Sequence, residues 1–263
     1  MTTTLLFLFC FAMAGATAGS FLSLASQRYR PELSTSQWLC LLCWPRSHCD
    51  DCGHVLCWPD LIPLFSWLAL GRRCRYCRSP IAMQTVAFEI SGMLVFMING
   101  TFFTSTLALT GATLCGCLLL LLADIDRRFQ RLPDSLTYIL LWSGLGYSLY
   151  QHSLTPSDAI LGALLGYLAF WLLAFLYRIF RKREGLGYGD MKLYAALGAW
   201  CGWQALPMIA FIAASLAFSL LVVLYVAGKT WKKDNPLPFG PFLAAAGWYV
   251  LIMQQPLSLN LRL

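Results

Sequence analysis

Charged side chains are scarce in this sequence. Only 12% of its 263 residues are Asp, Glu, Lys or Arg, whereas 59% are hydrophobic. Soluble proteins usually contain about 25% charged residues and roughly 45–50% apolar ones. So low a charge content excludes an ordinary soluble domain, and long apolar runs recur along the chain.

Histidine is rarer still, with three residues in the whole chain, His48, His54 and His152. They are scattered, and no Ser or Cys is matched to one of them as a nucleophile matched to its base would be. The sequence therefore gives no indication of a serine or cysteine hydrolase.

Eight apolar segments are predicted to be membrane-spanning helices. A bilayer core of about 30 Å needs roughly 20 apolar residues in a helix, and lipid requires every backbone polar group to be satisfied internally. We therefore predict an all-α polytopic membrane protein with about eight transmembrane helices. The segments are 5–27, 86–103, 107–123, 135–151, 158–178, 190–204, 207–227 and 238–255.

The first segment lacks the positive charge that precedes a signal peptide, because Met1-Thr-Thr-Thr4 carries no basic side chain. Ala16-Thr-Ala18 resembles a cleavage site, but basic residues instead follow the segment, at Arg28 and Arg30. We expect an uncleaved first helix whose N-terminus lies outside.

The basic residues are distributed asymmetrically. With both termini outside, all 19 Lys and Arg residues except Arg262 fall in loops on the inner side of the membrane or at the adjacent helix ends. This is the positive-inside pattern, so the net charge of +7 requires no nucleic-acid partner. The predicted cytoplasmic loops are 28–85, 124–134, 179–189 and 228–237. The predicted domains are a first helix (1–27), a Cys-rich loop (28–85) and a membrane core (86–263).

Seven of the 11 cysteines lie in the predicted loop 28–85. The cytoplasm is reducing, so metal binding explains them better than disulfides do. Cys49-Asp-Asp-Cys52 and Cys74-Arg-Tyr-Cys77 form two C-x₂-C pairs, whose four thiolates suit a tetrahedral structural Zn²⁺.

Other residues of the loop could compete for the metal. Cys40-Leu-Leu-Cys43 is a third pair, but its leucines and the absence of a following Gly make core packing the expected role. Cys57, His48 and His54 are possible substitute ligands, although residues so placed are more often bystanders.

Asp126 and Asp190 each lie at the mouth of a strongly apolar segment. A carboxylate at membrane depth costs about 2.5–3.5 kcal/mol on insertion scales, so it usually has a function. Two such groups that converge from different helices would form an acid–base pair able to activate water. The alternative is that both are interfacial helix caps.

Several motifs occur in an order that resembles one protein family. They are Gly19-Ser-Phe-Leu22, Asp60-Leu-Ile-Pro-Leu-Phe-Ser-Trp-Leu68, Ile125-Asp126 with Leu132-Pro-Asp-Ser-Leu-Thr137, Glu184-Gly-Leu-Gly-Tyr-Gly-Asp-Met-Lys-Leu193, Gly198-Ala-Trp-Cys-Gly-Trp203 and Pro238-Phe-Gly-Pro-Phe-Leu243. Nearly the whole chain resembles the bacterial type IV prepilin peptidases, membrane aspartic proteases of the Gly-x-Gly-Asp class.

The resemblance implies that Asp126 and Asp190 are catalytic. Asp124 is the competitor, but the family places its first catalytic Asp after Ile and eight residues before the Asp of Leu-Pro-Asp, here Asp134. Asp134 itself is expected to cap its helix. Gly187 and Gly189, with Gly185 before them, would let substrate backbone approach Asp190.

The family cleaves the leaders of type IV prepilins or type II secretion pseudopilins at the cytoplasmic face of the bacterial inner membrane. Cleavage follows a Gly and precedes Phe or a similar residue, and the new N-terminus is then methylated with S-adenosylmethionine. A substrate's apolar helix would lie in lipid among the spans. The sequence contains no glycine-rich nucleotide fingerprint that would locate the methyl donor.

Three positions in or beside the loop depart from the family pattern. Gly71-Arg72 reverses the usual Arg-Gly, Leu61 replaces Asn, and Thr85-Val86 replaces Tyr-Pro. All three lie in the part of the chain that the resemblance links to methyl transfer.

Two other functions are conceivable. A proton-coupled transporter could use the aspartates as relays, but it would be expected to show inverted repeats and acids near the midplane. A zinc-bearing membrane scaffold without chemistry would leave both acidic motifs unexplained.

Overall fold

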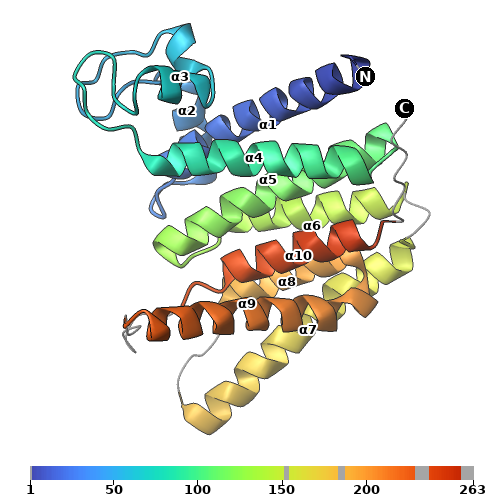
Figure 1. Ribbon diagram of the computed structural model, residues 1–263. Helices are drawn as coiled ribbons and strands as arrows, with labels where there is room; N and C mark the ends of the chain where they lie inside the picture. Colours follow the sequence, from blue (N-terminus) through green and yellow to red (C-terminus); the bar gives the residue numbers. More distant parts are fainter. Residues whose placement is uncertain (1, 151–153, 183–186, 229–236, 256–263) are drawn as a thin grey trace. The chain divides into compact units, whose positions relative to one another are not determined.

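The computed structural model describes residues 2–150, 154–182, 187–228 and 237–255. Its regular elements in these ranges are all helices, and its only β-type pairings there are two isolated bridges. The helices form two compact units, one ending at Thr101 and the other beginning at Phe102. Each unit is described separately below (Figure 1).

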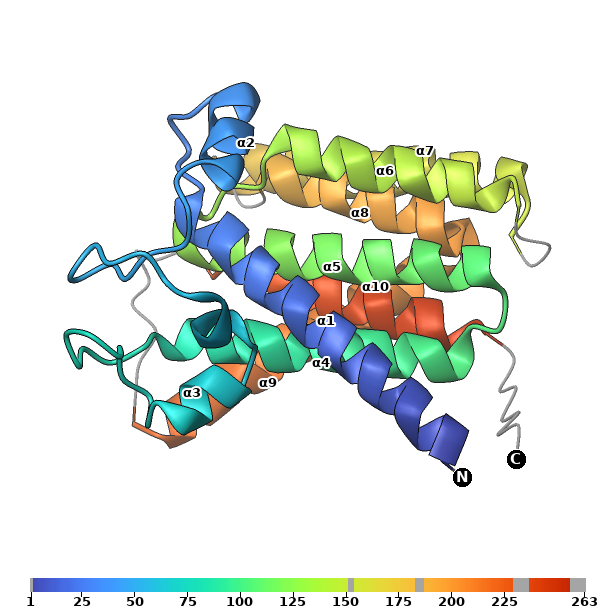
Figure 2. The ribbon, with the colours of Figure 1, turned by 90° about the horizontal axis from the view of Figure 1, so that it is seen from above.

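The first unit is framed by α1 (Thr2–Arg28) and α4 (Met83–Phe102). Figure 2 shows α1 crossing α4, and the backbones meet at glycines. A Cβ on Gly92 would lie 2.9 Å from the backbone of Gly19, so the crossing has no room for larger side chains.

Three short helices lie in the loop between α1 and α4. They are α2 (Thr35–Cys43), η1 (Trp58–Leu61) and α3 (Phe65–Ala69). The buried indole of Trp38 donates a hydrogen bond to the Ala25 carbonyl (3.1 Å), which fixes α2 on α1. The buried carboxylate of Glu89 in α4 accepts the Leu64 N–H (2.8 Å), so the loop is also held by α4.

The second unit is built around α8 (Tyr188–Cys201), in which every residue from Leu193 to Cys201 is buried. α8 contacts four other helices of the unit (Figure 1). They are α6 (Asp134–Ser148), α7 (Pro156–Arg181), α9 (Leu206–Val226) and α10 (Gly240–Met253). α5 (Thr106–Phe129) packs on α6 and α10, and η2 (Trp203–Ala205) follows α8.

The chain is an all-helical, multi-pass membrane protein, as predicted. Each of the eight predicted spans coincides with a helix, but only five helices within the described residues are long and apolar enough to cross a bilayer by themselves. α6, α8 and α10 have 15, 14 and 14 residues. The number of eight spans therefore remains a prediction.

One predicted boundary is wrong in a way that matters for the site. The third span was expected to end at 123, with Asp126 in the following loop. Instead α5 continues to Phe129, because Arg127 and Arg128 suit the negative C-terminal end of a helix. Asp126 therefore lies in the last turns of α5.

Candidate active site and metal centre

Asp126 is held at the junction of two helices of the second unit. It is 6% exposed, and its Oδ2 accepts a hydrogen bond from the Gly240 N–H at 2.9 Å. Gly240 is the first residue of α10, and Pro241 follows it, a residue well suited to the first turn of a helix. The start of α10 thus supplies a backbone donor to this carboxylate.

Asp190 lies in the first turn of α8, three residues after the N-cap Gly187. It is half-buried, and its carboxylate is close enough to that of Asp126 for the two to interact electrostatically. The structure therefore brings the two predicted aspartates together from different helices. Neither lies alone at the surface, as an ordinary interfacial cap would.

The neighbouring acids have other partners. Asp124 is paired with Arg127 at 2.6 Å, one helical turn further along α5. Asp134 was expected to cap its helix, but it is the first residue of α6, whose N-cap is Pro133. Its Oδ1 instead accepts a hydrogen bond from Lys192 Nζ at 2.6 Å, which joins the starts of α6 and α8.

The predicted glycines occupy different surroundings. A Cβ on Gly189 would lie 2.9 Å from the Leu132 Cβ, so the close approach there is to the protein's own chain. A Cβ on Gly187 would lie 3.4 Å from Asp190 Oδ2, an ordinary contact on the exposed side of the carboxylate. Gly185 and Glu184 lie outside the described residues.

Sequence reasoning missed two residues that the geometry places at the site. Gly240 belongs to a motif that was noted but given no role, although a Gly before Pro at a helix start is a usable signal for a backbone donor. Lys192 follows Asp190 by two residues, and its pairing with Asp134 could not be foreseen from spacing.

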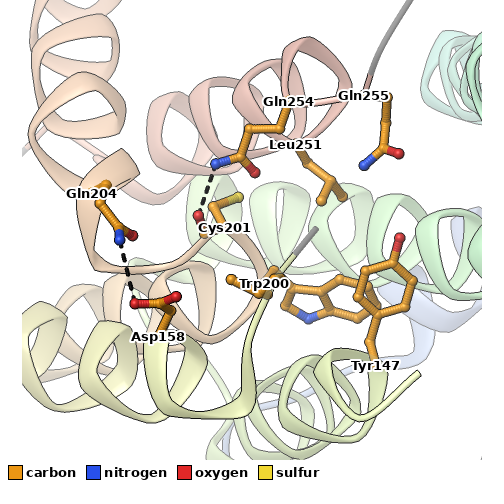
Figure 3. A pocket seen from close by; sticks show the side chains of 9 residues that line it. Tyr147, Asp158, Trp200, Cys201, Gln204, Leu251, Gln254 and Gln255 are labelled. Carbon is orange, nitrogen blue, oxygen red and sulfur yellow. Dashed lines mark hydrogen bonds between the residues drawn. The ribbon is translucent and has the colours of Figure 1, made fainter. Parts of the chain in front are cut away.

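A cavity of about 290 Å³ lies at the other end of α8 (Figure 3). Trp200, Cys201 and Gln254 line it, and Asp158 there accepts hydrogen bonds from Trp203 and Gln204. Asp190 is eleven residues before Cys201, a separation of about 16 Å along the helix. The cavity is thus separate from the pair Asp126 and Asp190.

The four predicted zinc ligands form one group in the first unit. The Sγ atoms of Cys49, Cys52, Cys74 and Cys77 all lie within 4.8 Å of one another. Those of Cys49 and Cys77 are 3.7 Å apart, close to the roughly 3.8 Å edge of a tetrahedron with Zn–S bonds of 2.3 Å. The donor set fits a structural Zn²⁺.

The two C-x₂-C pairs have the same backbone hydrogen bonds. The N–H of Cys49 binds the His54 carbonyl at 3.0 Å, and that of Cys74 binds the Ser79 carbonyl at 2.8 Å. The residue after each pair is left-handed, with φ of 69° at Gly53 and 63° at Arg78. The same type of turn therefore occurs in both C-x₂-C pairs of the Cys-rich loop.

Two of the four thiols have a lowered pKa, whereas desolvation and the neighbouring thiols of Cys77 and Cys49 raise the pKa of Cys52 to about 11. The backbone N–H groups of Cys52 and Asp51 lower the pKa of Cys49 to about 6. The Ser79 hydroxyl and backbone lower the pKa of Cys77. Because the thiolate is the metal-binding form, both effects favour a bound cation.

The other candidate ligands lie apart from this group. Cys40 and Cys43 are exposed on α2, so the expectation that they pack in a core is wrong. Cys57 Sγ lies 3.6 Å from the Tyr76 hydroxyl, and the His54 ring packs against the Tyr76 ring at a tilt of 34° with centroids 3.6 Å apart. Both therefore have non-metal partners.

The departures from the family pattern have local structural roles. Arg72 has φ of 66°, and its guanidinium lies 4.8 Å above the Trp67 ring. Thr85 accepts a hydrogen bond from Gln27 (3.3 Å). Leu61 is exposed at the end of η1.

Comparison with known proteins agrees with the motifs. Residues 113–223 match the type IV leader peptidase family, Peptidase A24, and residues 13–103 match the bacterial Peptidase A24 N-terminal domain. No solved structure gives a significant match.

Curated relatives named prepilin leader peptidase/N-methyltransferase cover most of the chain. The protein from Burkholderia pseudomallei (strain K96243) is 43% identical over 84% of this chain and 71% of its own. That from Pectobacterium carotovorum subsp. carotovorum is 43% identical over 81% and 76%. That from Klebsiella pneumoniae is 37% identical over 78% and 90%. The chain therefore belongs to the type IV leader peptidase family.

Proposed function

We propose that this protein is a prepilin leader peptidase/N-methyltransferase of the bacterial inner membrane. It cleaves the leader of type IV prepilins or type II secretion pseudopilins after a Gly and before Phe or a similar residue. It then methylates the new amino terminus. The observation that carries the peptidase proposal is the convergence of Asp126 and Asp190 from α5 and α8.

The aspartate pair supplies both groups that amide hydrolysis needs. Two adjacent carboxyl groups share one proton, because both cannot ionise comfortably. The ionised carboxylate takes a proton from water, whose oxygen bonds to the scissile carbonyl carbon. The protonated carboxyl donates a hydrogen bond to the carbonyl oxygen. When the C–N bond breaks, the carboxyl group that took the proton from water gives it to the leaving nitrogen, which becomes the amine.

Substrate reaches this site from the membrane. A prepilin's apolar N-terminal helix lies among the spans and presents its junction at the cytoplasmic edge, where the basic residues gather. Both termini of the enzyme are then periplasmic. Membrane lipid is the surrounding partner, and nucleic acid has no role. The relatives lend no support to the alternative of a proton-coupled transporter.

Zn²⁺ stabilises the loop module. Cys49, Cys52, Cys74 and Cys77 would hold it with a closed set of four thiolates, which leaves no coordination position open for chemistry. Bound metal would lock the two C-x₂-C turns together.

S-adenosylmethionine would bind the same module. Two buried polar atoms there have no hydrogen-bond partner among the described residues, the acceptor Asp60 Oδ2 and the donor Trp67 Nε1. They fit a ligand that carries ribose hydroxyls and a carboxylate. S-adenosylmethionine would supply an electrophilic methyl group, which the free amine of the cleaved pilin accepts.

Mass spectrometry of a purified prepilin incubated with the detergent-solubilised protein tests this function. We expect cleavage at the Gly–Phe junction and, with S-adenosylmethionine, one added methyl on the mature N-terminus. Intact prepilin after incubation with protein that remains monodisperse and zinc-bound would refute the peptidase proposal.

A further inference from the structure

The carboxylate of Asp126 faces the start of another helix, although it lies near the end of its own. The C-terminal turns of α5 carry partial negative charge, which disfavours an anion, whereas the unpaired N–H groups at the start of α10 carry partial positive charge. The Gly240 N–H makes a direct buried hydrogen bond to Asp126 Oδ2 at 2.9 Å. The start of α10 therefore stabilises the negative charge on Asp126 that the end of α5 disfavours.

Gly240 is required at this point for space. A Cβ there would lie 2.7 Å from Asp126 Oδ2 and 2.9 Å from its Cγ, closer than real Cβ atoms come. The backbone of Gly240 is not left-handed, so conformation does not explain the glycine. Its absent side chain is what lets the helix start touch the carboxylate.

Asp190 is placed differently. It lies in the first turn of its own helix beside the N-cap Gly187 and is more exposed than Asp126. Within the described residues, no other helix gives its carboxylate a hydrogen bond of the kind that Gly240 gives Asp126. The first turn of α8, including the nearby Gly187 backbone, also favours a charged Asp190. A direct buried hydrogen bond to a carboxylate stabilises its charged form more than a helix start does, so the shared proton belongs on Asp190.

We propose that the start of α10 keeps Asp126 ionised, which makes Asp126 the base toward water and Asp190 the acid toward the scissile carbonyl. Gly240 is then a positioning residue that acts through Asp126. This inference rests on the proposed peptidase function and assigns the separate roles within the pair.

Asp124 and Asp134, the other acidic residues at these helix ends, are each paired with a basic side chain. On α5, Asp124 binds Arg127, and at the start of α6 Asp134 binds Lys192 of α8. α10 carries no acidic or basic side chain in Gly240–Met253. Asp190 is therefore the titratable partner whose proton a change at Gly240 would redistribute.

The test compares Gly240→Ala with Gly146→Ala in prepilin cleavage by the full-length protein. Gly146 lies in α6, and a Cβ there would meet nothing within 4 Å. We expect Gly240→Ala to lower kcat roughly 100-fold with KM changed by less than about threefold, because a displaced catalytic group loses alignment. Gly146→Ala should behave as wild type.

The pH profile of kcat/KM distinguishes positioning from simple damage. Loss of the N–H bond should move the acidic limb, which reports the base, upward by about one pH unit and leave the basic limb in place. Movement of the basic limb alone would reverse the assignment. Wild-type kcat and an unchanged profile in Gly240→Ala would overturn the inference.

A second measurement holds even where Gly240→Ala fails to fold, as judged by loss of a monodisperse state in detergent. The amide in Asp190→Asn can still donate a hydrogen bond to the carbonyl, whereas the amide in Asp126→Asn cannot act as a base. Residual cleavage should therefore be at least about tenfold higher in Asp190→Asn than in Asp126→Asn. Equal or reversed residual rates contradict the assignment. Wild-type cleavage by both variants would instead show that Asp126 and Asp190 are not the catalytic pair.

Discussion

The aspartate site and the cysteine group are assembled in opposite ways. Cys49 and Cys77, whose sulfur atoms are 3.7 Å apart, are separated by 28 residues and positioned by two local turns. The hydrogen bond between Gly240 and Asp126 joins residues 114 apart and depends on the packing of α5 against α10. One centre is made by local backbone geometry and the other by helix packing.

This difference predicts how each centre fails. A change in the cysteine group should release metal and disturb the loop while the second unit keeps its fold. A change at the aspartates should remove chemistry and leave metal in place. The predictions below test whether the two centres are independent.

The largest effect is expected at the aspartates. Asp126→Asn and Asp190→Asn should each lower prepilin cleavage by at least about a thousandfold, because members of a catalytic unit are individually indispensable. Asp124→Asn should keep substantial activity, since Asp124 binds Arg127 rather than the pair. Mass spectrometry of the cleaved prepilin measures both.

The same variants test independence of the centres. Methyl transfer to a pre-cleaved pilin with a free N-terminus should survive Asp190→Asn. Its loss in a folded protein would mean that one site serves both reactions. An inactive Asp124→Asn beside an active Asp126→Asn would show that the first catalytic residue is assigned wrongly.

Removal of zinc ligands should have the converse result. The wild type should hold about one Zn²⁺ per chain, and the double variant Cys49→Ser with Cys52→Ser should lose this metal. The rate of methyl transfer by the double variant should fall at least about tenfold. The rate of prepilin cleavage by this variant should stay within about threefold of the wild-type rate. Metal analysis by mass spectrometry measures the zinc content. A full zinc content in this variant would indicate that Cys40 and Cys43 are ligands in place of Cys49 and Cys52.

The cysteine group could be predicted from sequence because its geometry is local. Spacing alone selected Cys49, Cys52, Cys74 and Cys77, and the same local turn places the two thiols of each pair side by side. The exposure of Cys40 could not be deduced, because it depends on how α2 lies on α1.

The aspartate site could be predicted only in part. Apolar surroundings and family motifs identified Asp126 and Asp190, and the helices followed from hydropathy. The end of α5 was misplaced because Asp124 and Asp126 interrupt the apolar run without breaking the helix. The contact with Gly240 depends on tertiary packing, which no local pattern encodes.

A smaller effect is expected at the glycines before Asp190. Gly189→Ala would force Leu132 to move, and such overpacking costs about 1–3 kcal/mol. We expect a roughly tenfold lower kcat/KM for cleavage. Gly187→Ala meets only an ordinary contact with Asp190 and should lose less than about threefold. A greater loss at Gly187 would indicate that substrate backbone, rather than Leu132, requires the glycines.

The smallest effect is expected in the repeated turn. Arg78 holds the left-handed position that Gly53 holds in the first C-x₂-C pair. Arg78→Gly should therefore stabilise the zinc-bound module by roughly 1 kcal/mol, since a left-handed conformation costs about that much for a residue with a Cβ. The midpoint of denaturant-induced zinc release measures this change.

Arg72→Gly is the matched comparison, because Arg72 is also left-handed but lies over the Trp67 ring. Relief of strain there is offset by the loss of a cation–π contact of about 0.5–1 kcal/mol. We expect almost no change in the midpoint, and the double variant Gly71→Arg with Arg72→Gly restores the family order as a control. Equal stabilisation at both positions would show that the contact with Trp67 contributes nothing. Destabilisation by Arg78→Gly would show that the two turns are not equivalent, and the cysteine group would then depend on more than its local backbone.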